Sequence, residues 1–119
     1  MGACREVESI AMDITDTDLA FLPAAELARR IRVGEVTSFD VTERFLTRIN
    51  RYDSKLHAYI AVYEDEARMA AEAADLAIKA GQAVGPFHGV PVALKDIIEI
   101  EGRIGPRSQG RARSRRHHQ

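Results

Sequence analysis

Lys95 is the residue whose type and position most clearly point to chemistry. It directly follows the apolar run at residues 90–94, and the turn residues Pro86 and Gly89 separate that run from any preceding helix. The pattern predicts a short strand with Lys95 at its end. A lysine at the end of an apolar strand could lose part of its hydration, which favours the neutral amine, the form that acts as a base.

Other interpretations of this segment remain open from the residues alone. The stem of Lys95 could pack on the strand end while its ammonium group stays in water beside Asp96. Pro91 favours a strand start or an edge position, because proline has no N–H to give to a ladder. His88 could touch a ligand near Lys95, or it could serve as a structural hydrogen-bonding residue of the turn.

The segment at residues 85–96, GPFHGVPVALKD, resembles the lysine-bearing segment of the amidase signature family. Members of that family hydrolyse carboxylic amides. The preceding chain is similar to the family in the order and character of its elements, and the resemblance extends from about Asp18 to Gly102. It implies an α/β fold, as the N-terminal fragment of an α/β/α domain several times longer, with mainly helices, one or two short strands and disordered ends. Such a fragment would leave exposed the surfaces that pack against the rest of the domain in a full-length protein.

The resemblance also implies a mechanism and a catalytic role for Lys95. In the family, a neutral lysine takes a proton through a bridging serine in a cis peptide, and a second serine attacks the amide carbonyl. Those serines lie downstream of the lysine. Ser108 and Ser114 stand in an arginine-rich segment without a glycine/serine-rich context, so they receive no catalytic role. We therefore predict a truncated chain that is inactive alone.

The substrate stays open at this point. The resemblance implies a small-molecule amide, and it leaves open both simple hydrolases and the branch that works within a tRNA-dependent amidotransferase. It implies no cofactor. The four histidines lack the spacing of a metal site, so no metal is expected either. Docking of the exposed faces to a full-length homologue, or to a second copy, is a further hypothesis.

The charge of the chain is divided unevenly along its length. The formal net charge is −1, yet residues 103–119 hold six arginines and no acidic residue. A basic tail of this kind could bind nucleic acid, which is the alternative function. It could also be a disordered end without function, and the absence of aromatic residues among the arginines disfavours a nucleic-acid partner. A third hypothesis is that the chain leaves the family reading frame near Ile104.

Composition bounds the remaining possibilities. The single cysteine, Cys4, allows no internal disulfide, and residues 1–17 read as a flexible leader without the apolar core of a signal peptide. No apolar run approaches the 18 residues that indicate a membrane span, so we expect no membrane partner. The sequence predicts a cytoplasmic protein with a partial amidase domain over residues 18–102 and an arginine-rich tail over residues 103–119.

Three helices are expected to carry the Lys95 segment. An apolar stripe predicts the first, with Gly34 as its stop; Thr37 or Ser38 could cap the second, and residues 50–54 are its expected exit turn. Residues 57–62 are predicted to form a strand. The third helix opens at an acidic cluster near Glu64 and ends at Gly81. The first two stripes are Ala24, Leu27, Ala28 and Ile31, and Val41, Phe45, Leu46 and Ile49.

Three tyrosines cluster around the strand predicted at residues 57–62 and have two interpretations. Their rings could stack on a substrate, or they could pack on the protein and leave their hydroxyl groups in water. The residues are Tyr52, Tyr59 and Tyr63.

Overall fold

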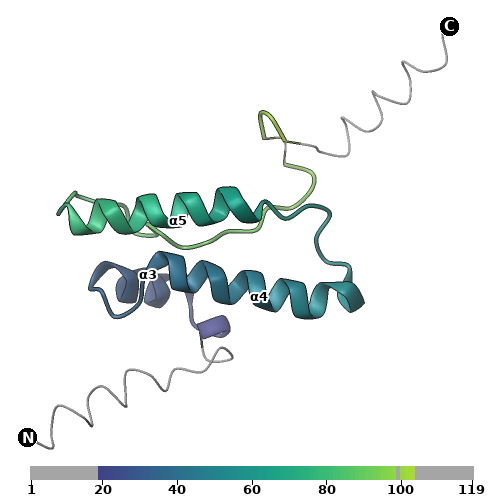
Figure 1. The fold of residues 1–119 in the computed structure, drawn as a ribbon, viewed down its shortest axis with the longest axis horizontal. Helices are drawn as coiled ribbons and strands as arrows, with labels where there is room; N and C mark the ends of the chain where they lie inside the picture. Colours follow the sequence, from purple (N-terminus) through teal and green to yellow (C-terminus); the bar gives the residue numbers. More distant parts are fainter. Residues whose placement is uncertain (1–18, 99, 104–119) are drawn as a thin grey trace, which may run out of the picture.

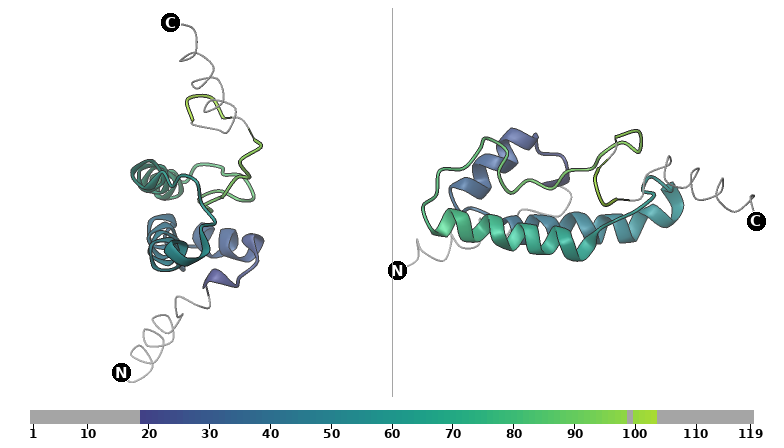
Figure 2. Two further views of the ribbon diagram at one scale, coloured as in Figure 1. Left: turned by 90° about the vertical axis from the view of Figure 1, so that its right-hand side faces the viewer. Right: turned by 90° about the horizontal axis from the view of Figure 1, so that it is seen from above.

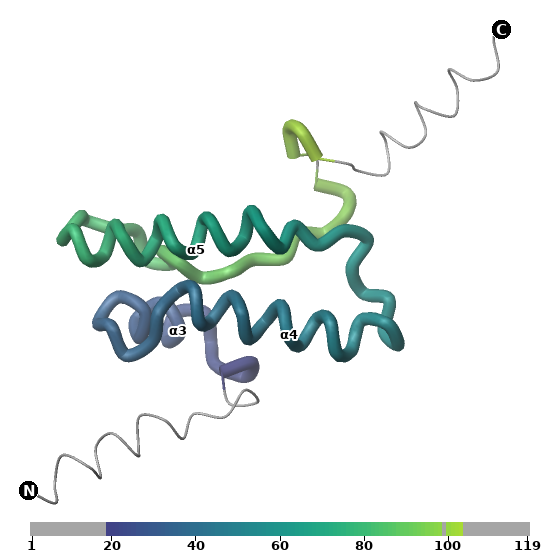
Figure 3. Tube along the Cα trace, in the orientation of Figure 1, coloured from purple at the N-terminus to yellow at the C-terminus, as the bar shows by residue number. Residues whose placement is uncertain are grey.

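The computed structural model describes residues 19–98 and 100–103, and these are mainly helical (Figure 1). Helices α3 (Ala24–Arg32), α4 (Ser38–Leu56) and α5 (Glu64–Lys79) follow one another along the chain. Helices α4 and α5 lie antiparallel and side by side, and α3 lies against the first half of α4 (Figures 1 and 2). After α5 the chain turns back and runs lengthwise along this pair, as the tube in Figure 3 shows.

Helix α3 forms as its apolar stripe predicts. Leu27, Ala28 and Ile31 of the stripe are buried, whereas Ala24 in its first turn is exposed. Arg29 and Arg32 are exposed. The helix ends where expected, because Gly34 adopts a φ of +79° that glycine tolerates and most residues do not. The Gly34 amide donates to the Ile31 carbonyl at 3.2 Å and the Glu35 amide donates to the Arg30 carbonyl at 2.9 Å, which closes a Schellman motif.

Helix α4 begins as the capping pattern predicts, and Thr37 is the cap. Its hydroxyl oxygen accepts from the Asp40 amide at 3.0 Å. The expected exit turn at residues 50–54 is wrong, because the helix continues to Leu56 and His57 ends it with a φ of +50°. The carboxylate of Asp53 accepts from the Ala58 amide at 2.7 Å, so this residue stabilises the helix end rather than the predicted turn.

Helix α5 confirms the third predicted helix and its stop. Gly81 has a φ of +70°, and its amide donates to the Ile78 carbonyl at 3.0 Å. Alanines fill much of the helix, which packs against α4, and Ala71 is its buried residue. The small side chains let the two helices lie close together.

Neither predicted strand forms in the described part of the chain. Residues 57–62 and 90–94 have no ladder partner, and a strand needs a neighbour whose N–H and C=O groups pair with its own. Apolar alternation and turn residues indicate that a segment can be extended, but they do not supply that neighbour. The described residues therefore show a mainly helical structure, without the strands that the α/β expectation requires.

The core is small and lies where α3 meets the start of α4. Leu19, Leu27, Ile31 and Val41 form its buried cluster, and Val90 packs on its edge. Many large apolar side chains remain exposed elsewhere, among them Val92, Leu94, Ile97, Ile98 and Ile100. The predicted leader, the arginine-rich tail from residue 104 and the reading-frame hypothesis near Ile104 lie outside the described residues.

Candidate functional site

Lys95 is exposed in the segment that follows α5. Its backbone carbonyl accepts from the Ile98 amide at 3.0 Å, which places it at the start of a turn. Among the described residues, its side chain has no hydrogen-bonding or ion-pair partner. The expected loss of hydration at a strand end is therefore not seen, because no strand forms and Leu94 is itself 55% exposed.

The turn before Lys95 is tied to all three helices by hydrogen bonds. The Ser38 hydroxyl of α4 donates to the Gly89 carbonyl at 2.6 Å. The His88 ring nitrogen Nε2 lies 2.9 Å from the Ala74 carbonyl of α5 and donates to it, since a carbonyl only accepts. Arg32, at the end of α3, donates to the Pro86 carbonyl at 3.2 Å. His88 thus has the structural role that was one of its two interpretations.

Asp75 is the residue that sequence reasoning missed. From the second half of α5, its two carboxylate oxygens accept from the backbone amides of Ser38 at 2.7 Å and Phe39 at 3.0 Å. A carboxylate at this place satisfies N–H groups that the first turn of α4 leaves free and also complements the helix dipole. Only the packing of α5 on α4 brings the carboxylate there, so no local sequence signal could have identified it.

Gly89 is required where the turn meets α3 and α4. Its φ is +80°, and a Cβ atom added to it would lie 3.1 Å from both Ser38 Cβ and Oγ, and 3.2 Å from Ile31 Cγ2. The missing side chain therefore allows the close approach in which Ser38 reaches the Gly89 carbonyl.

A second attachment lies on the other side of Lys95. The Arg103 guanidinium stacks 3.8 Å from the centroid of the Tyr63 ring and pairs with Glu66 at the start of α5. Arg103 is the first residue of the predicted tail. The Lys95 segment therefore contacts the helices both before and after the lysine.

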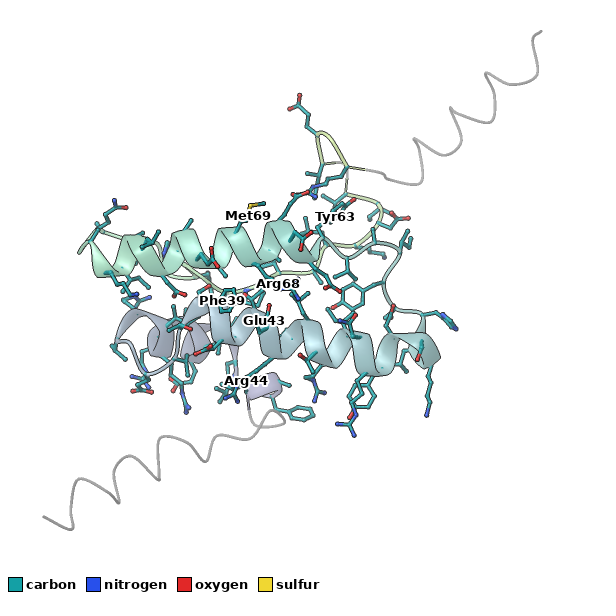
Figure 4. All side chains as sticks on the ribbon, in the orientation of Figure 1. Phe39, Glu43, Arg44, Tyr63, Arg68 and Met69 are labelled. Atoms are coloured by element: carbon teal, nitrogen blue, oxygen red, sulfur yellow. The ribbon has the colours of Figure 1, made fainter. Side chains whose placement is uncertain are left out.

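An ion-pair cluster joins the two long helices. Arg68 of α5 pairs with Glu43 of α4, and Figure 4 shows the two side chains directed toward one another between the helices. Arg68 also pairs with Glu64 at 3.4 Å and Asp65 at 3.5 Å. The hydrogen bond with Glu43 raises the pKa of Arg68 above its usual value, the direction expected for a cation that pairs with carboxylates.

The three tyrosines remain partly exposed, in line with packed rings and wet hydroxyl groups. Arg48 and Arg51 lie over the Tyr52 ring at 5.5 and 5.3 Å from its centroid, and Arg103 covers Tyr63. Within residues 19–98 and 100–103, no three His, Cys, Asp or Glu side chains gather in a way that could hold a metal ion. No helix in the same part of the chain is both long and apolar enough to cross a membrane.

Comparison with known proteins identifies the family of this chain. A family model described as Amidase matches residues 40–104, which include the Lys95 segment. The chain belongs to the amidase family. The resemblance inferred from GPFHGVPVALKD is thereby confirmed.

Its relatives carry two kinds of name. The chain is 42% identical over 91 residues to a glutamyl-tRNA(Gln) amidotransferase subunit of Streptomyces avermitilis, covering 76% of this chain and 18% of that protein. It is 40% identical over 86 residues to an amidase of Pseudomonas putida, covering 72% of this chain and 18% of that protein. A putative amidase, AmiB2, of Mycobacterium tuberculosis is 46% identical over 88 residues, covering 74% and 19% respectively. The chain thus spans less than a fifth of these relatives, and no solved structure matches it.

The serines of this amidase-family chain do not meet Lys95 in the described residues. Ser38 is buried and bonded to Gly89, and Ser54 is exposed near the end of α4. Ser9, Ser108 and Ser114 lie outside the described part. The arrangement therefore presents an exposed lysine on an anchored segment.

Proposed function

We propose that this chain is the N-terminal part of an amidase and that Lys95 is the base of its reaction. The observation that carries the proposal is the family match over residues 40–104, which includes GPFHGVPVALKD. In the proposed reaction, the neutral lysine accepts a proton through a bridging serine. The nucleophilic serine then attacks the carbonyl of a carboxylic amide, the C–N bond breaks, and the amine leaves with the proton that Lys95 returns. Water then hydrolyses the acyl-enzyme and releases the acid.

The exposed apolar side chains after Val90 support the proposal. Val92 is 80% exposed and Ile97 is 75% exposed, values that are unusual for such residues gathered in one short segment. In a complete amidase domain, additional chain would cover this row and could supply the neighbouring strands that residues 90–94 lack. We propose that the segment then becomes a strand of an α/β/α fold and that Lys95 loses water at its end.

The 119-residue chain alone is proposed to be inactive. A base without its nucleophile lacks one component of a unit whose members act together, and the loss of such a component costs several orders of magnitude in rate. The proposed substrate of a complete enzyme is a small-molecule amide. For the 119-residue chain alone, we propose docking to a full-length homologue as a way to cover its exposed apolar side chains.

A fusion protein tests the proposal. In the fusion, residues 19–103 of this chain replace the matching N-terminal segment of the Pseudomonas putida amidase. Hydrolysis of aliphatic and aryl amides is measured for the fusion and for the 119-residue chain alone. We expect hydrolysis by the fusion and none by the chain. A well-folded fusion without activity would contradict the amidase role, and hydrolysis by the chain alone that disappears in Lys95→Ala would contradict the proposed inactivity.

A further inference from the structure

The hydrogen bonds around Gly89 join three parts of the chain that are distant in sequence. Asp75 of α5 holds the backbone at Ser38 through the amides of Ser38 and Phe39, at 2.7 and 3.0 Å. Ser38, at the start of α4, in turn donates to the Gly89 carbonyl at 2.6 Å. The Asp75 carboxylate therefore influences the turn at Gly89 only indirectly, by holding Ser38 in place.

The hydrogen bond between Ser38 and Gly89 is shielded from water. Ser38 is 1% exposed, so no water can readily replace its hydroxyl at the Gly89 carbonyl. The approach also leaves little room for a side chain at Gly89, because an added Cβ would lie 3.1 Å from the Ser38 side chain. A displaced turn would leave a buried hydroxyl without its acceptor.

From this geometry we infer that Ser38, held by Asp75, is a positioning residue for Lys95. The inference rests on the proposed role of Lys95 as the base. Val90, next to the anchored Gly89, packs on the edge of the core, and Pro91 then restricts the backbone. A fixed Gly89 therefore sets the direction in which the chain approaches Lys95. The residues from position 92 to Lys95 are exposed and have little packing of their own to fix them.

Spin labels on the full 119-residue chain measure this positioning directly. One label pair joins position 95 to the exposed position 72 on α5, through Lys95→Cys and Glu72→Cys. A second pair, Thr47→Cys with Glu72→Cys, reports on the packing of α4 against α5. The native Cys4 is replaced by serine, and pulsed electron paramagnetic resonance gives the distance distribution of each pair.

Ser38→Ala is the decisive variant. Loss of one ordinary hydrogen bond is expected to raise the population outside the main 95-to-72 distance peak about fivefold, while the 47-to-72 distribution stays unchanged. Asp75→Asn, which keeps one acceptor oxygen, is expected to give a smaller increase. Ser54→Ala, which removes an exposed serine of the same helix, is the matched control and should change neither distribution.

Two results would overturn the inference. One is an unchanged 95-to-72 distribution in Ser38→Ala, and the other is an equal broadening of both label pairs, which would assign Ser38 a general structural role. The labels report position and require no turnover. An inactive fusion would therefore refute the amidase proposal but leave the effect of Ser38 on the 95-to-72 distance unaffected. An unchanged 95-to-72 distribution would refute the positioning role of Ser38 and say nothing about hydrolysis.

Discussion

Asp75→Ala tests whether one carboxylate on α5 stabilises the start of α4. Asp75 accepts from two backbone amides, and one of them belongs to Ser38, which is 1% exposed. A buried N–H without a partner costs about 1 to 3 kcal/mol, and the loss of a negative charge at a helix N-terminus adds about 0.3 to 1 kcal/mol. We therefore expect the free energy of unfolding to fall by about 1.3 to 4 kcal/mol.

Urea unfolding followed by far-UV circular dichroism measures this change. Glu72→Ala is the matched control, because Glu72 is an exposed acid on the same helix, and it should change the free energy of unfolding by less than about 0.5 kcal/mol. Asp75→Asn should fall between the two, since it keeps one acceptor and loses the charge. Equal stabilities of Asp75→Ala and Glu72→Ala would refute the assignment of Asp75 as the acceptor that stabilises the first two amides of α4.

Three further variants test other parts of the fold by the same unfolding measurement. Gly89→Ala should destabilise the chain more than Gly81→Ala, because both have positive φ but of these two only Gly89 would place a Cβ within 4 Å of other atoms; equal losses would argue against the close contact. Ile31→Ala should cost about 2 to 5 kcal/mol, whereas exposed Val33→Ala should cost less than about 0.5 kcal/mol, and similar effects would argue against the core described above. Hydrogen bonds from Arg29 and then Arg30 lower the pKa of Glu26 from 4.5 to about 2. The ion pairs of Glu26 therefore stabilise the folded chain above pH 4.5 and lose this effect as the pH falls toward 2. Glu26→Gln should reduce the loss of folding stability on acidification in low salt. An unchanged dependence of stability on pH would contradict the pairing.

Local rules predicted the helices well because their signals lie within a few residues. The stripe ending at Ile31, the stop at Gly34 and the cap at Thr37 all depend on neighbours along the chain. The family was also predicted correctly, because the resemblance is carried by GPFHGVPVALKD, one short continuous segment that can be recognised without knowing the fold.

Contacts between distant segments could not be predicted in this way. The pairing of Asp75 with the amide of Ser38 depends on how α5 packs, and an aspartate within a helix carries no sign of a partner 37 residues away. The strand expected before Lys95 failed for a related reason, since apolar residues and turns indicate an extended segment but not the neighbour with which it pairs. Lys95, which was expected at the end of that strand, is exposed.

The pH–rate profile of the fusion protein with Lys95 intact and with Lys95→Ala tests the central claim most directly. General base catalysis contributes about 10² to 10⁴ in rate, so we expect kcat/KM for amide hydrolysis to fall by at least that factor in Lys95→Ala, with the folded state preserved. The ascending limb of the profile should disappear with it. A variant that keeps both its kcat/KM and its pH dependence would contradict the assignment of Lys95 as the base.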